Sequence, residues 1–62
     1  LELERIKNNV IRSLKKFEEM KNQYAREKNR LAQDKLIELK RQIEIAKIEF
    51  QYNLRTLNVL LP

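Results

Sequence analysis

The chain has 62 residues, a formal net charge of +5, and no Cys, His or Gly. A chain this short buries little surface when it folds alone, and the absence of Cys and His excludes disulfides and the usual structural zinc ligands as sources of stability. The absence of Cys is also typical of an intracellular protein, although it does not indicate the compartment. We therefore expect the chain to gain its stability from partner chains.

The composition predicts an all-α protein. Pro62 is the only proline, and charged residues (37%) and apolar residues (42%) nearly balance, as in long helices that carry an apolar seam. Because no Gly or Pro interrupts residues 1–61, the sequence favours one long amphipathic helix that assembles as a coiled coil or helical bundle. The helical pattern is already under way at Leu1, so we interpret residues 1–62 as one coiled-coil segment of a longer protein.

Residues 1–31 carry a heptad repeat with one apolar seam and a basic surface. The a positions are apolar five times in succession, whereas Ser13 and Glu27 occupy two of the d positions. The large rings at two a positions favour three or four helices over two. The predicted interface residues of this half are Leu3, Ile6, Val10, Phe17, Met20, Tyr24 and Leu31.

The charges that flank this seam argue against a parallel homodimer. In such a dimer Lys16 would face Lys21 of the other copy, and Arg30 would face Lys35. An antiparallel arrangement, or a partner chain with acidic flanks, would avoid this repulsion. The sequence therefore predicts that the chain binds itself, an acidic coiled-coil partner, or both.

The pattern changes between the two halves. Arg26 to Arg30 contains no apolar residue, and Leu31 and Leu36 are five residues apart, which is neither of the two helical spacings. We favour a continuous helix with a local change of seam, because no Gly or Pro marks a turn. The alternative is a hairpin bend near residues 29–34, with Asp34 as the N-cap of a second helix.

Residues 36–61 carry a second apolar seam with one polar exception. Asn53 occupies a d position, where a buried amide can fix the alignment of helices. We favour the alternative, in which the neighbouring Leu54 turns inward and Asn53 lies at the edge. The predicted interface residues of this half are Leu36, Leu39, Ile43, Ala46, Phe50, Leu54, Leu57 and Leu61.

The same segment carries a second apolar stripe, nearly opposite the first at about 100° per residue. The spacing favours a second helix contact over scattered surface residues, and repeated contacts of this kind would allow filament growth. The residues from Leu57 to Leu61 are apolar on nearly all sides, which indicates burial at the end of a bundle. The predicted second contact face consists of Ile37, Ile45, Ile48, Tyr52 and Val59.

No group of residues indicates catalysis or cofactor binding. Ser13 and Thr56 have no His to activate them, and the acidic residues alternate with Lys and Arg as on a solvated helix surface. We therefore predict no enzyme activity, no cofactor and no metal. Six basic residues could contact phosphates, namely Arg12, Lys15, Lys16, Arg26, Lys28 and Arg30, so nucleic acid is the alternative partner, although nearby Glu residues dilute the positive field. An anionic membrane surface is a further alternative, but the heptads indicate that the apolar face meets protein instead.

The heptads resemble those of coiled-coil segments in scaffold, cytoskeletal, tethering and chromosome-associated proteins. That resemblance implies a structural oligomerisation module and does not choose among these processes. We therefore expect a scaffold element with a basic, single-seam half (residues 1–31) and a two-faced apolar half (residues 36–61).

Overall fold

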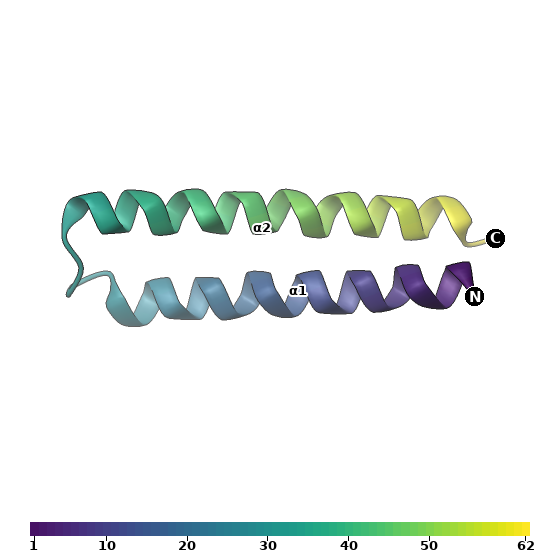
Figure 1. Ribbon diagram of the computed structural model, residues 1–62, viewed down its shortest axis with the longest axis horizontal. Helices are drawn as coiled ribbons and strands as arrows, with labels where there is room; N and C mark the ends of the chain where they lie inside the picture. The colour runs from purple at the N-terminus through teal and green to yellow at the C-terminus, as the bar shows by residue number, and fades with distance from the viewer.

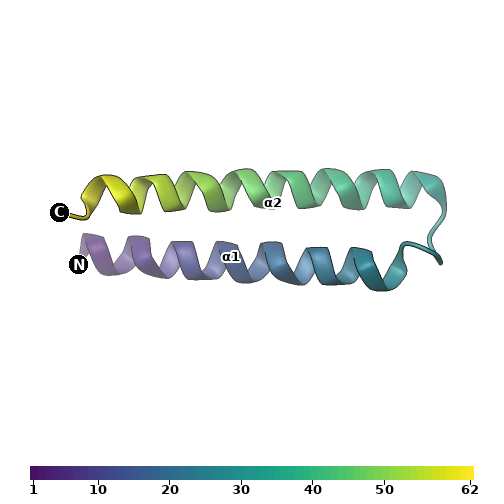
Figure 2. The same cartoon turned by 180° about the vertical axis from the view of Figure 1, so that it is seen from behind.

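Two antiparallel helices contain nearly the whole chain. The computed structural model describes all of residues 1–62. Helix α1 spans Glu2–Glu27 and α2 spans Gln33–Leu60, and the two lie side by side with both termini at one end (Figures 1 and 2). The hairpin measures 46 × 14 × 14 Å. The all-α prediction is confirmed, but the chain does not form the single long helix that we favoured.

The reversal between the helices uses only ordinary backbone conformations. Lys28 keeps helical geometry (φ −59°, ψ −27°), and its N–H donates to the Tyr24 carbonyl over 2.9 Å. The N–H of Leu31 donates to the Glu27 carbonyl over 3.1 Å. Ala32 then leaves the helical region (φ −65°, ψ 158°) and redirects the chain into α2. No residue has a positive φ, so the turn requires no glycine.

This turn explains why the continuous helix was the wrong preference. That preference rested on the absence of Gly and Pro, and a reversal in which no residue has a positive φ requires neither. The bend lies close to residues 29–34, as in the alternative reading. Asp34 is not the N-cap, however. Ala32 holds that position without a side-chain cap, and Asp34 lies in the first turn, where its charge interacts favourably with the helix dipole.

The contact between the helices forms a thin core. Only three of the 62 residues are buried, among them Ile6 and Ala46. Near the middle of the contact, the rings of Phe17 and Phe50 stack with centroids 6.4 Å apart and planes inclined by 19°. Aromatic pairs in this range contribute about 0.5–1.5 kcal/mol beyond the area they bury. A core of this size is marginal for an isolated domain.

Ion pairs on the outside of the helices add little to this core. The sequence offers six pairs in which an acidic residue precedes a basic one by three positions, and three of them form, namely Glu2–Arg5, Glu18–Lys21 and Glu38–Arg41. Their side chains are about half exposed or more, so solvent screens the attraction between them.

The hairpin fold can be tested by the distance between a residue near the N-terminus and one near the C-terminus. Asn8 and Asn58 are both exposed, and each lies within eight residues of a chain terminus. The two termini lie at the same end of the hairpin (Figure 1). Spin labels on an Asn8→Cys/Asn58→Cys variant should be less than about 30 Å apart, because packed helix axes are about 8–10 Å apart. A continuous helix would separate the labels by about 75 Å. Pulsed electron resonance on samples diluted with unlabelled chain, which removes distances between copies, would measure the difference.

Candidate interaction surfaces

The two predicted seams pack against each other within one chain. Of the predicted interface residues, Leu3, Leu54 and Leu61 are exposed. The others are buried or half-buried between the helices: Ile6, Val10, Phe17, Met20, Tyr24, Leu31, Leu36, Leu39, Ile43, Ala46, Phe50 and Leu57. The residues that we assigned to contacts between chains therefore make the contact between α1 and α2.

A polar pair interrupts this seam. Ser13 is 5% exposed, and its hydroxyl donates to the carbonyl of Asn9 at 2.8 Å, with the Val10 carbonyl at 3.1 Å. The Asn53 amide donates to the same hydroxyl oxygen over 3.2 Å. Ser13 Oγ thus acts as donor within α1 and as acceptor from α2. No buried side-chain polar atom lacks a hydrogen-bond partner.

The placement of Asn53 corrects our sequence interpretation. Asn53 lies half-buried in the seam, whereas Leu54 is 38% exposed. We did not predict from the sequence that Ser13 is the hydrogen-bond partner of Asn53. The spacing of the two residues indicates the pairing, because both are polar d residues and both lie 20 positions from Gln33, one on either side. A hairpin that turns just before Gln33 therefore brings them together.

One side of the seam is a polar groove of about 540 Å³ above this pair. Arg12 and Lys16 line it from α1, and Glu49 and Tyr52 line it from α2. Lys16 thus shares this groove with Glu49. In a parallel homodimer, Lys16 would instead face Lys21 of the other copy. The Ser13 hydroxyl at the base is already engaged in hydrogen bonds and has no base beside it.

The other side of the seam is basic, and lysines lie over its rings. Lys21 Nζ is 4.7 Å from the centroid of Phe17, and Lys40 Nζ is 5.8 Å from that of Tyr24. Such cation–π contacts contribute about 0.5–1 kcal/mol at exposed sites. We define the basic flank by the lysines at the e positions of this side, namely Lys7, Lys21, Lys28, Lys40 and Lys47.

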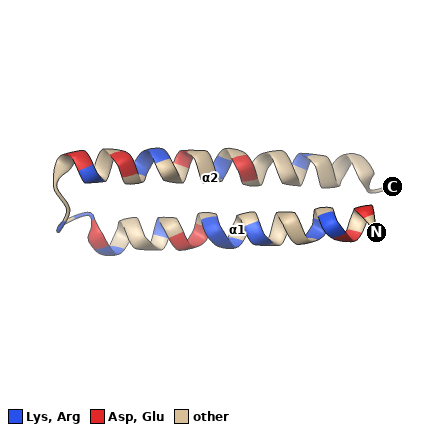
Figure 3. Ribbon diagram, viewed as in Figure 1, with Lys and Arg blue, Asp and Glu red and all other residues tan.

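The predicted second contact face lies on α2 and is uncovered in the hairpin, although Tyr52 also borders the polar groove between the helices. Ile45, Ile48 and Tyr52 are 53%, 57% and 67% exposed, and Ile37 and Val59 are also exposed. We call these five residues the outer stripe. Figure 3 shows that charge is concentrated on α1 and the first part of α2, and Arg55 is the only charged residue after Glu49. The outer stripe therefore runs into a nearly uncharged end of the helix.

No group of three or more His, Cys, Asp or Glu residues is arranged to hold a metal ion. Neither helix combines the length and the hydropathy that crossing a membrane requires. Comparison of the chain with protein-family models, curated proteins and solved structures gives no match.

The polar pair can be tested with a double-mutant cycle. Ser13→Ala and Asn53→Ala should each lower the free energy of unfolding by about 1 kcal/mol, because each leaves the other polar group without its partner. The double variant should lose less than the sum, with a coupling of about 0.5–1 kcal/mol. Urea unfolding followed by circular dichroism measures all four proteins. Additive losses would mean that the hydrogen bond between the helices contributes no stability.

Proposed function

We propose that this chain is a structural assembly module, a helical hairpin that associates with another helix through the outer stripe of α2. The observation that carries the proposal is that an apolar stripe at helical spacing stays exposed after the chain has closed its own seam. Exposed apolar patches that follow one helix face are typical of protein–protein contacts.

Energetics supports the same proposal. The hairpin buries three residues and leaves the isoleucines of the outer stripe at least half exposed. Burying one such side chain contributes about 1.5–3 kcal/mol, so covering the stripe adds several kcal/mol to a marginal fold. A scaffold role follows from this, because such a module joins the proteins that contain it.

A second candidate function is binding of a nucleic acid, and the basic flank is the observation that favours it. Lys21 and Lys40 lie on one side of the hairpin, and a groove of about 490 Å³ separates them. Glu44 lines the same groove, and Glu18 forms an ion pair with Lys21. These acids reduce the positive potential, so assembly remains the better supported function.

The assembly proposal predicts a concentration-dependent mass. The wild-type chain should exceed its 7.6 kDa monomer mass at high concentration, by light scattering. An Ile45→Gln/Ile48→Gln/Tyr52→Gln variant should stay at lower mass while remaining helical by circular dichroism, since these three side chains are more than half exposed in the hairpin. Ile11→Gln is the matched control, because Ile11 is exposed on α1 outside the outer stripe. Equal association by the triple variant and the wild type would contradict a role for the outer stripe.

The nucleic-acid candidate predicts a steep salt dependence. Retention of a labelled duplex should fall as salt rises from 50 to about 200 mM, because bound lysines release counterions from the phosphates. A Lys21→Gln/Lys40→Gln variant should bind more weakly with a shallower slope, whereas Lys15→Gln tests an exposed lysine outside the basic flank. No retention at about 50 mM salt would exclude this candidate.

A further inference from the structure

We propose that the partner of the outer stripe is a second copy of this chain, bound antiparallel through α2 in one defined alignment. This inference rests on the proposed function and adds the identity and orientation of the partner. It follows from a second heptad repeat on the outer face of α2. The first core position of this repeat holds Glu38, Ile45, Tyr52 and Val59. The second core position holds Arg41, Ile48 and Arg55.

Charge decides the orientation of two such helices. A parallel, in-register pair would place each residue opposite its own copy. Glu38 would then face Glu38, and Arg41 and Arg55 would face their own copies, so three layers would set like charges together. An antiparallel pair sets the two heptad positions against each other instead, which removes these repulsions.

In one antiparallel alignment, the three layers nearest the two-fold axis all bring together residues that interact favourably. When Ile45 faces Ile48 of the second copy, two-fold symmetry brings four isoleucines together at the centre. The next layer outward sets Tyr52 opposite Arg41 of the second copy, a pairing suited to cation–π contact. The following layer sets Arg55 opposite Glu38 of the second copy. Each of these layers occurs twice, once on either side of the symmetry axis.

The neighbouring alignments and the flanking positions support this choice. A shift by one heptad in either direction leaves Arg55 or Glu38 opposite an isoleucine and loses both ion pairs. In the proposed alignment, the flanking residues set no like charges together, because Glu44 faces Gln51 and Gln42 faces Glu49.

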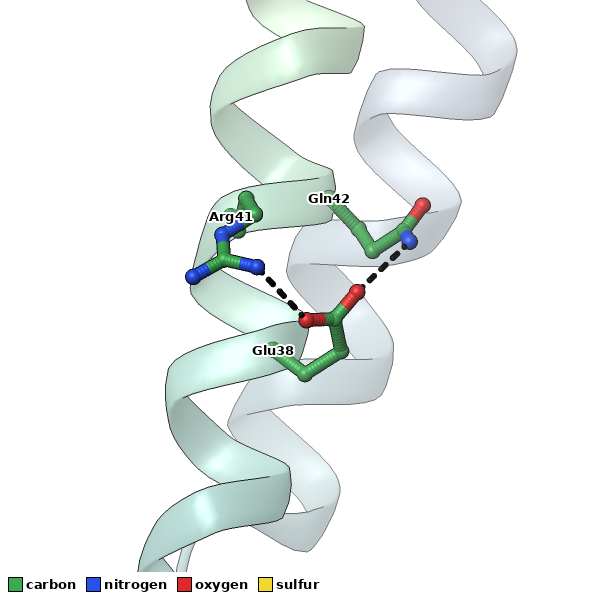
Figure 4. Close-up of polar contacts among 3 residues, drawn as sticks. All are labelled: Glu38, Arg41 and Gln42. Atoms are coloured by element: carbon green, nitrogen blue, oxygen red, sulfur yellow. Dashed lines mark hydrogen bonds and ion pairs between the residues drawn. The ribbon is translucent and has the colours of Figure 1, made fainter.

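The hairpin already holds Glu38 in place for this contact. Its carboxylate accepts hydrogen bonds from Arg41 over 3.2 Å and from Gln42 over 3.1 Å, one to each oxygen. Figure 4 shows the carboxylate between these two side chains on the surface of α2. The Glu38 side chain remains 54% exposed, so it is accessible to another chain. Arg55 is exposed and has no ion-pair partner within the hairpin.

A charge exchange tests this alignment. Glu38→Arg would set arginine opposite Arg55 in two symmetric layers, and Arg55→Glu would set glutamate opposite Glu38. Each single variant should weaken the dimer about tenfold by sedimentation equilibrium. The Glu38→Arg/Arg55→Glu double variant should recover to within about threefold of the wild type, because the opposite charges face each other again.

A cysteine exchange gives an independent measurement, since the chain has no cysteine of its own. Glu44→Cys mixed with Gln51→Cys should form the mixed disulfide in preference to either homodimer. A parallel pair would favour the two homodimers, which would overturn the inference. Dimers with unchanged affinity in all three charge variants would also overturn it and leave the assembly proposal standing. A helical monomer at millimolar concentration would overturn the self-association, and with no other partner helix bound it would remove the support for the assembly proposal as well.

Discussion

The antiparallel contact between two heptad seams is the interaction on which the rest of the hairpin depends, and the Ser13–Asn53 hydrogen bond fixes its alignment. Apolar seams tolerate sliding, because one leucine or isoleucine replaces another at similar energy. A shift of one heptad would set Asn53 opposite Ile6 or Met20, and its amide would lose its partner on α1. The polar pair thus excludes the alignments that the apolar residues alone would allow, and the short turn acts in the same direction.

The distribution of charged side chains around the hairpin also follows from the antiparallel contact between α1 and α2. Flanking charges argued against a parallel homodimer, and the hairpin provides an antiparallel arrangement within one chain, where Lys16 shares a groove with Glu49. Reversing one helix on the other also gathers lysines on the opposite side. There Lys21 and Lys40 lie over aromatic rings of the seam, so their stems cover apolar surface while their charges remain in water.

The sequence predicts the parts of this structure that depend on local periodicity. The all-α class and nearly all the seam residues follow from heptads, because a helix places residues on a face according to spacing alone. The turn could not be found in this way, since residues 28–32 reverse the chain without Gly, Pro or a positive φ. Asn53 was misplaced for a different reason. Whether it or Leu54 faces inward depends on Ser13, forty residues away, which becomes its neighbour only when the hairpin forms.

The two helices differ in how much apolar surface they retain. Outside the seam, α1 exposes Ile11 and Leu14 in its middle, whereas α2 exposes a full stripe. In the proposed dimer the α2 helices would therefore lie inside and the α1 helices outside. A two-fold contact uses the same surface on both copies, so it closes at two and leaves no outer stripe for a third. Filament growth would need a second apolar face on α1, and two residues do not make one. The asymmetry of the hairpin therefore favours a closed assembly over the filament that the two-faced sequence first allowed.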